Sequence, residues 1–258
     1  LGYTEPEAGS DLANLSIRAE DKGDHFIING GKLYNTACHY AQYHWLGART
    51  EVIKPKHRGI SLFVVDMKTP GIRILPILVM GGERTNEVYY DNVKVSKECL
   101  IGEKNRGFYY ILEALDHERI YTISSLSKLF DDVVDYTKER GKNSDRVIVQ
   151  KLGELATEIE IARLFALRIP WMLDRGKVPN YEASMLKVFV TELQQRIVNT
   201  GMEIFDLRGL LQSDSKWALL DGNLQRLYQD SVRALITRGT CEVMRNVIAQ
   251  RGLGLPRG

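Results

Sequence analysis

The sequence of 258 residues predicts an α+β chain, in which an antiparallel β barrel or sandwich is followed by a four-helix up-down bundle. Short β-branched and aromatic runs, cut by Gly, Pro and Asn, fill residues 1–105. From residue 106 onward, apolar residues recur with helical spacing instead. Strands that follow one another without intervening helices are typical of antiparallel barrels and sandwiches. We therefore expect two domains, 1–105 and 106–258.

The β half contains four strand candidates, at residues 25–28, 60–65, 72–75 and 88–90. Each is a short run rich in Ile, Val, Phe or Tyr, the residues that favour a pleated surface. The dipeptide Pro70-Gly71 and the tripeptide Asn29-Gly30-Gly31 are turn signals between such runs.

The helical half begins with apolar residues at 108, 111, 112 and 115, which follow the i, i+3, i+4, i+7 pattern. This stripe passes through residues 118 and 119 and resumes at Thr122, Leu126, Leu129 and Val133. Three more helical patterns cover residues 147–173, 180–197 and 219–250. Four long helices with short connections predict an antiparallel bundle.

Composition excludes several classes of function. The 35 basic and 33 acidic side chains nearly cancel, so neither nucleic acid nor an anionic membrane is an expected partner. There is no apolar run of 18 residues, so we expect no membrane span. Cys38, Cys99 and Cys241 fit no ligand pattern, which indicates a reducing compartment, the cytoplasm, without disulfides or metal. The chain starts at Leu1 rather than Met, which suggests a fragment.

Two segments of the β half are candidates for ligand contact. Residues 4–11 form a Gly- and Pro-containing loop with a hydroxyl near each end, from Thr4 and Ser10. Such a loop can direct hydroxyls and N–H groups at a polar ligand, but an ordinary capped turn has the same composition. In residues 30–37, Tyr34 could stack on a planar ring and Thr36 could hydrogen-bond to it, or the segment is simply a hairpin turn.

Two further segments lie in the helical half. Glu118 falls on or beside the apolar stripe, where a carboxylate is costly unless it is paired or used in chemistry. An ion pair with another helix is the plain alternative. In residues 238–246, Thr240 caps a helix that carries Glu242 in its first turn. The same geometry can hold a phosphate, a ribose or an adenine group.

Taken in order, these segments resemble the acyl-CoA dehydrogenase family. Residues 4–11 are similar to its flavin- and substrate-contacting loop, 31–36 to its GxKxWIT segment, and 238–245 to its GGTSEIxR signature. Residues 90–95 and 100–102 resemble its FDNVRVP…LIG join, and 157–163 and 181–187 resemble bacterial members that act on bulky or steroid-side-chain acyl-CoAs. The family's N-terminal helical domain is missing, its RxxFG motif is not recognisable near Arg140, and residues 206–211 keep one glycine of its phosphate loop.

The resemblance implies a non-covalent FAD and an acyl-CoA substrate. A glutamate removes the α proton, the β hydrogen leaves as hydride to the flavin, and a trans-2-enoyl-CoA forms. The electrons then pass to an electron-transfer flavoprotein, and the protein is a homo- or hetero-tetramer. By position, the contacts with FAD fall on Leu1, Tyr3, Thr4, Ser10, Tyr34, Thr36, Thr240 and Glu242, and those with the CoA portion fall on Ser10, Asp116 and Arg119.

The family supplies its catalytic base from one of two positions. One is the residue before the Gly-Thr of the C-terminal signature, which is Arg238 here, and a guanidinium cannot accept a proton. The other is the glutamate of an LDxER stretch, which is Glu118. Glu118 is therefore the expected base. Two alternatives remain: a non-catalytic subunit paired with a catalytic homologue, which Arg238 favours, and a flavin-dependent oxidase.

Overall fold

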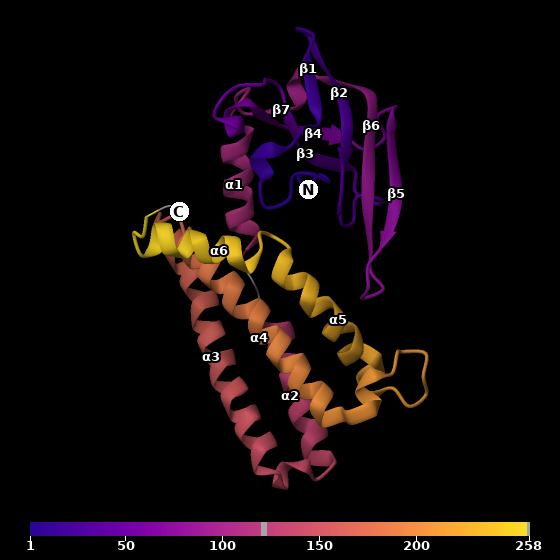
Figure 1. Cartoon of the computed structure of the whole chain (residues 1–258), viewed down its shortest axis with the longest axis vertical. Coiled ribbons are helices and arrows are strands. Elements are labelled where there is room, and N and C mark those ends of the chain that lie inside the picture. Colours follow the sequence, from indigo (N-terminus) through magenta and orange to yellow (C-terminus); the bar gives the residue numbers. More distant parts are fainter. Residues whose placement is uncertain (120–122, 257–258) are drawn as a thin grey trace. The chain divides into compact units, whose positions relative to one another are not determined.

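The structure, a computed structural model, describes residues 1–119 and 123–256. It divides into two compact units, Leu1–Leu115 and Asp116–Gly258. The first unit holds the β-sheet and the second holds most of the helices (Figure 1). Each unit has its own hydrophobic core. The α+β class predicted from the sequence is confirmed.

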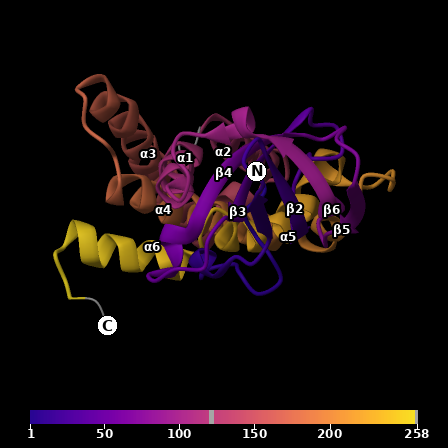
Figure 2. The ribbon, with the colours of Figure 1, turned by 90° about the horizontal axis from the view of Figure 1, so that it is seen from above.

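The first unit contains a seven-stranded sheet in the order β5-β6-β2-β1-β3-β4-β7. Figure 2 shows its β2, β6 and β5 strands side by side. All four strand candidates lie within observed strands. The bounds are β1 (Arg18–Asp21), β2 (His25–Lys32), β3 (Tyr43–Arg49), β4 (Ile60–Asp66), β5 (Ile72–Leu78), β6 (Arg84–Ser96) and β7 (Leu100–Ile101).

The sheet is mixed and open, whereas the sequence predicted an antiparallel barrel or sandwich. Strands β1 and β3 pair in parallel at Arg18 and Arg49. This follows from the chain path, because β2 runs antiparallel to β1 and the chain turns back again to form β3. Within residues 1–119 the sheet ends at β5 on one side and β7 on the other, so closure into a barrel is not confirmed.

The expected turn at Asn29-Gly30-Gly31 was wrong, because these residues lie inside β2. The pairing of β2 with β6 shifts register between Ile28 and Gly30, as in a β-bulge. Gly30 has a φ of +138°, and a Cβ there would lie 2.8 Å from Cγ1 of Ile17. The glycine therefore permits a close approach within the sheet. The turn predicted at Pro70-Gly71 is confirmed.

Both units contain helices. They are α1 (Gly107–Glu118), α2 (Ser124–Glu139), α3 (Arg146–Asp174), α4 (Tyr181–Phe205), α5 (Asn223–Ile236), α6 (Cys241–Val247) and a π-helical turn, η7 (Ile248–Gly252). Short 3₁₀ segments are η1 (Leu12–Asn14), η2 (Lys56–Gly59), η3 (Lys97–Cys99), η4 (Lys142–Ser144), η5 (Asp206–Leu210) and η6 (Leu219–Gly222). The core of the second unit is built from α2, α3, α4 and α5. A four-helix up-down bundle stays a prediction, and Thr122 of the predicted stripe lies outside the described residues.

The single helix expected over residues 219–250 was wrong. The chain leaves the helical conformation between α5 and α6, where Arg238 has a φ of +59° and Gly239 a φ of +89°. Thr240 is extended and accepts a hydrogen bond from the N–H of Val243, so a new helix begins after it. Apolar periodicity continues across this break because both helices bury residues against α4, and periodicity alone does not reveal a cap.

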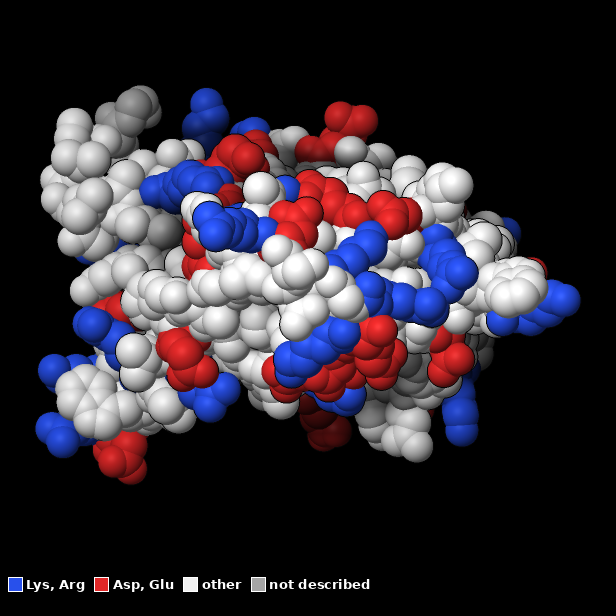
Figure 3. All heavy atoms as spheres, turned by 90° about the horizontal axis from the view of Figure 1, so that it is seen from below, with Lys and Arg blue, Asp and Glu red and all other residues white. Residues whose placement is uncertain are grey.

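The outer surface carries charges of both signs. Figure 3 shows Lys and Arg side chains interspersed with Asp and Glu side chains on the face that it presents, in agreement with the near-zero net charge. In the described part of the chain, every helix is too short or too polar to cross a lipid bilayer.

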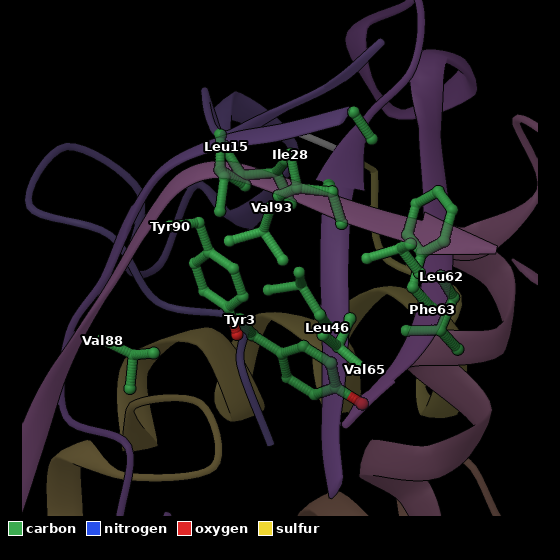
Figure 4. Packing of buried hydrophobic residues seen from close by; sticks show 14 of the residues in the cluster. Tyr3, Leu15, Ile28, Leu46, Leu62, Phe63, Val65, Val88, Tyr90 and Val93 are labelled. Atoms are coloured by element: carbon green, nitrogen blue, oxygen red, sulfur yellow. The ribbon is translucent and has the colours of Figure 1, made fainter. Parts of the chain in front are cut away.

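The core of the β unit contains polar groups among its apolar side chains. Leu46, Val65, Val88 and Val93 are almost completely buried, and Tyr90 lies among them with 3% of its surface exposed (Figure 4). Buried polar groups of this kind need hydrogen-bond partners. The hydroxyl of Tyr90 is paired with Nδ1 of His44 on β3.

Candidate active site

A buried ion pair fastens the N-terminal loop of the β unit. The Lys32 Nζ atom lies 2.8 Å from Glu5 Oε1, and it also donates to the carbonyl of Tyr3 at 2.9 Å. The other oxygen of Glu5 accepts from the backbone N–H and the hydroxyl of Ser16, at 2.6 and 2.7 Å. These bonds fix residues 3–5 against the end of β2.

The charges of this pair are set by burial and by each other. Burial raises the pKa of Glu5, but Lys32 and Ser16 outweigh it, so the pKa ends below its usual value. Burial lowers the pKa of Lys32 to about 8, against the opposing effect of Glu5. At neutral pH both groups are therefore charged, and the loop is held by a charge-assisted bond.

The residues predicted to contact FAD on the β unit lie in two segments that are joined to each other. The N–H of Leu33 donates to the carbonyl of Thr4 at 2.8 Å, which links residues 1–10 to the turn at residues 34–37. Leu1 and Ser10 are exposed, Thr4 is partly buried and Tyr3 is buried.

The exposed side chains of these segments suit FAD. Tyr34 is 61% exposed and Thr36 is exposed beside it. An exposed aromatic ring offers a flat face to a planar ring system, and a neighbouring hydroxyl can donate or accept at its polar edge.

The helical unit brings together the two positions from which the family draws its base. Glu118 Oε1, at the end of α1, lies 3.5 Å from Arg238 Nε. The side chain of Glu118 is 35% exposed and that of Arg238 is 38% exposed. Glu118 is thus less buried in this chain than its place on the apolar stripe predicted, and it is engaged in an ion pair.

A clamp of buried and partly buried polar groups holds the backbone of Arg238. Arg119 donates to the Arg238 carbonyl at 3.2 Å and to Asp116 Oδ1 at 2.7 Å. The second oxygen of Asp116 accepts from Asn180 at 3.2 Å. Burial raises the pKa of Asp116, although Arg119 and Asn180 oppose this. Asp116 and Arg119, which the sequence assigned to CoA contact, thus also position Arg238.

Thr240 and Glu242 lie at the start of α6, and the cap predicted there is confirmed. Thr240 Oγ1 accepts from the N–H of Val243 at 3.2 Å. The pKa of Glu242 is lowered because its carboxylate accepts from its own backbone N–H and from the Thr240 hydroxyl. Both side chains are at least partly accessible, as contact with the adenosine portion of FAD requires.

Sequence reasoning missed one residue beside this helix start. Lys187 of α4 is fully buried, and its Nζ atom donates to the Leu235 carbonyl at 2.8 Å and to Cys241 Sγ at 3.3 Å. It therefore joins the end of α5 to the start of α6. A lysine in a helical pattern is normally expected at the surface, so periodicity gave no signal for this role.

Comparisons with known proteins identify the family. Residues 1–93 match the model of the acyl-CoA dehydrogenase middle domain, and residues 105–253 match that of the acyl-CoA dehydrogenase C-terminal domain. The chain belongs to the acyl-CoA dehydrogenase family. It is accordingly an FAD-dependent oxidoreductase that dehydrogenates acyl-CoA thioesters.

Individual relatives agree with this. The chain is 35% identical over 269 residues to acyl-CoA dehydrogenase FadE29 of Mycobacterium tuberculosis, an alignment that covers 100% of this chain and 68% of FadE29. A solved Tcur3481-Tcur3483 steroid ACAD variant has a TM-score of 0.95 and 32% identity, covering 100% of this chain and 68% of that one. The ChsE4-ChsE5 complex of M. tuberculosis has a TM-score of 0.88 and 32% identity, with the same coverage.

Proposed function

We propose that Glu118 is the base that removes the α proton of the acyl-CoA. The observation that carries this is the ion pair between Glu118 and Arg238. It brings together the family's two base positions, of which only Glu118 can accept a proton. The Glu118 side chain is 35% exposed and belongs to the last residue of α1.

The remaining site residues bind and orient. When bound, FAD supplies the acceptor for the hydride that leaves the β carbon. Tyr34 and Thr36 would lie against its ring, Leu1, Tyr3, Thr4 and Ser10 would line it, and Thr240 and Glu242 would contact its adenosine portion. Ser10, Asp116 and Arg119 contact the CoA portion. Glu118 takes the α proton, and the product is a trans-2-enoyl-CoA.

Arg238 must release Glu118 before the base can act. The Arg238 guanidinium, 3.5 Å away, occupies the carboxylate that must reach the α proton. We propose that substrate binding displaces the Arg238 side chain while the clamp from Arg119 keeps its backbone in place.

The same ion pair supports a second candidate, in which this chain is a non-catalytic subunit of a heteromeric acyl-CoA dehydrogenase. In that case Arg238 stays on Glu118, and a homologous subunit performs the chemistry. The relative in the ChsE4-ChsE5 complex functions within an assembly of two different chains. Whether the Arg238 side chain leaves Glu118 when substrate binds therefore decides between the two candidates.

The deciding experiment follows flavin absorbance in FAD-loaded protein after acyl-CoA is added. The wild type is expected to bleach, and Arg238→Gly is expected to bleach at least as fast. Glycine tolerates the positive φ of residue 238, so the backbone is preserved. Arg238→Lys is the matched control that keeps a cation. A wild type that fails to bleach, with activity appearing only in Arg238→Gly, would support the non-catalytic subunit.

Several broader assignments complete the proposal. We assign residues 1–105 and 106–258 to the flavin-contacting and helical domains, and place the protein in the cytoplasm. An electron-transfer flavoprotein is the proposed electron acceptor, and a homo- or hetero-tetramer is the proposed assembly. Reduction of added electron-transfer flavoprotein in the presence of acyl-CoA tests the acceptor, whereas peroxide formed in air without it would indicate an oxidase.

A further inference from the structure

The turn that presents Tyr34 and Thr36 has a strained backbone. Tyr34 has a φ of +56° and Ala37 a φ of +66°, although neither residue is glycine. This left-handed conformation costs roughly 1–2 kcal/mol per residue. Something in the surrounding structure must therefore hold the turn.

Asn35, between the two exposed side chains, is the anchor. It is 1% exposed, and it pairs with Asn86 of β6 in both directions. The N–H and the side-chain amide of Asn35 donate to the Asn86 carbonyl at 2.9 and 3.3 Å, and Asn86 Nδ2 donates to the Asn35 carbonyl at 2.8 Å. Tyr34 and Thr36 are therefore held on either side of a fixed point.

His44 of β3 holds Asn35 in turn. Its Nε2 atom lies 3.0 Å from Asn35 Oδ1, and its Nδ1 atom lies 2.5 Å from the hydroxyl of Tyr90 on β6. Burial lowers the pKa of His44 to about 3, so the ring is neutral with one donor and one acceptor. Burial also raises the pKa of Tyr90, which keeps its proton. Tyr90 therefore donates to Nδ1, and Nε2–H donates to Asn35.

The other segment predicted to contact FAD on the β unit, residues 1–10, also contacts His44. The Gly2 N–H donates to the Trp45 carbonyl at 2.8 Å, so the N-terminal segment lies alongside β3. A Cβ on Gly2 would stand 2.5 Å from Cε1 of His44, so the backbone there lies in close contact with the imidazole. One buried ring thus supports both segments.

We propose that the buried chain Tyr90–His44–Asn35–Asn86 is a positioning network that fixes the FAD-contacting face of the β unit, with His44 as its central residue. This rests on the proposed assignment of Tyr34 and Thr36 to FAD contact. The network spans two strands, β3 and β6, and the turn, and each of its buried polar groups has a partner. An unpartnered member would cost stability, so the arrangement has one favoured geometry.

The test compares His44→Leu with Val93→Ala. Both variants change a buried side chain of the same unit, but the Val93 side chain has no hydrogen-bonding group. Amide hydrogen exchange without added FAD is measured at Asn35, whose N–H is bonded to Asn86. We expect exchange at Asn35 to accelerate about tenfold or more in His44→Leu and to stay near the wild-type rate in Val93→Ala. Tyr90→Phe, which removes only the hydroxyl, should act in the same direction with a smaller effect.

FAD affinity, measured by flavin fluorescence and by the absorption spectrum of the bound flavin, is the second readout. We expect His44→Leu to weaken binding about tenfold and Val93→Ala to leave it unchanged. His44→Gln, which keeps one donor and one acceptor, should recover part of both losses.

The outcomes separate the inference from the proposed function. Unchanged exchange at Asn35 in His44→Leu and Tyr90→Phe would overturn the positioning network. Faster exchange with unchanged FAD affinity would instead overturn the contact of Tyr34 and Thr36 with FAD. Should the wild type fail to bind FAD, the proposed function fails, while the exchange comparison still decides whether the network holds the turn.

Discussion

Burial keeps His44 of the β unit uncharged, and this has a consequence for stability. Its pKa is lowered from 6.5 to about 3 because the ring is buried. Between these values the unfolded chain binds a proton that the folded chain does not. Stability must therefore fall as the pH falls through this window.

We expect His44 to contribute a slope of about 1.4 kcal/mol per pH unit below pH 6.5. Urea unfolding at pH 6.5 and pH 5 measures it, and His44→Gln should show a shallower slope than the wild type. Equal slopes in the two proteins would contradict the burial of a neutral His44.

Lys32 and Glu5 give a second prediction at this scale. Lys32→Met leaves the Glu5 carboxylate buried without its cation, which typically costs about 3–5 kcal/mol of unfolding free energy. Lys138→Met breaks an exposed pair with Asp135 and should cost less than about 1 kcal/mol. Chemical denaturation compares the two variants, and similar costs would argue against the buried pair as the fastening of the loop.

At the scale of secondary-structure elements, the break between α5 and α6 requires a glycine. Gly239 has a φ of +89°, and a Cβ there would lie 2.7 Å from Cε of Met244. Gly239→Ala should therefore destabilise the protein by at least about 1 kcal/mol. Gly153, inside α3, has nothing within 4 Å of its Cβ position, and Gly153→Ala should stabilise by up to about 1 kcal/mol.

Thermal unfolding of both variants distinguishes the two environments. If Gly239→Ala were as stable as Gly153→Ala, then the strained connection before Thr240 would have no energetic basis. In that case, the positive φ angles of residues 238 and 239 would also not be what directs the Arg238 side chain to Glu118.

Much of this element structure could be predicted from the sequence, and the exceptions have physical causes. Strands such as β2 and β4 alternate or cluster apolar residues, so they were found. Strand β3 contains a buried histidine and a glycine, and β1 is short and mostly polar, so neither has a strong signal. The parallel pairing of β1 and β3 depends on long-range contacts that no local pattern encodes.

The candidate site was only partly accessible to the same reasoning. Glu118, Thr240 and the turn of Tyr34 and Thr36 stand in recognisable motifs. The groups that position the site, His44, Lys187 and Arg119 through its bond to the Arg238 carbonyl, act through tertiary hydrogen bonds between distant segments. Pattern and spacing contain no information about such partners, so the structure was needed to find them.

For the whole molecule, the apolar surface of the helical unit leads us to expect an assembly of several chains. Leu164, Leu167 and Trp171 of α3 are each at least half exposed and share one helix face. Large apolar side chains grouped in this way indicate an interface. We expect a tetramer by light scattering, and Leu164→Glu with Leu167→Glu should reduce the mass to that of a dimer or monomer. A monomeric wild type with FAD bound would count against the tetramer.

The most direct test of the central claim is the rate of flavin reduction in FAD-loaded Glu118→Gln after rapid mixing with acyl-CoA. Glutamine keeps the shape of the side chain but cannot accept the α proton, so reduction should slow by at least about a hundredfold while acyl-CoA still binds. Glu113→Gln, on the exposed side of the same helix, makes the same change in charge and should reduce at the wild-type rate. Reduction of Glu118→Gln at the wild-type rate would contradict the assignment of Glu118 as the base.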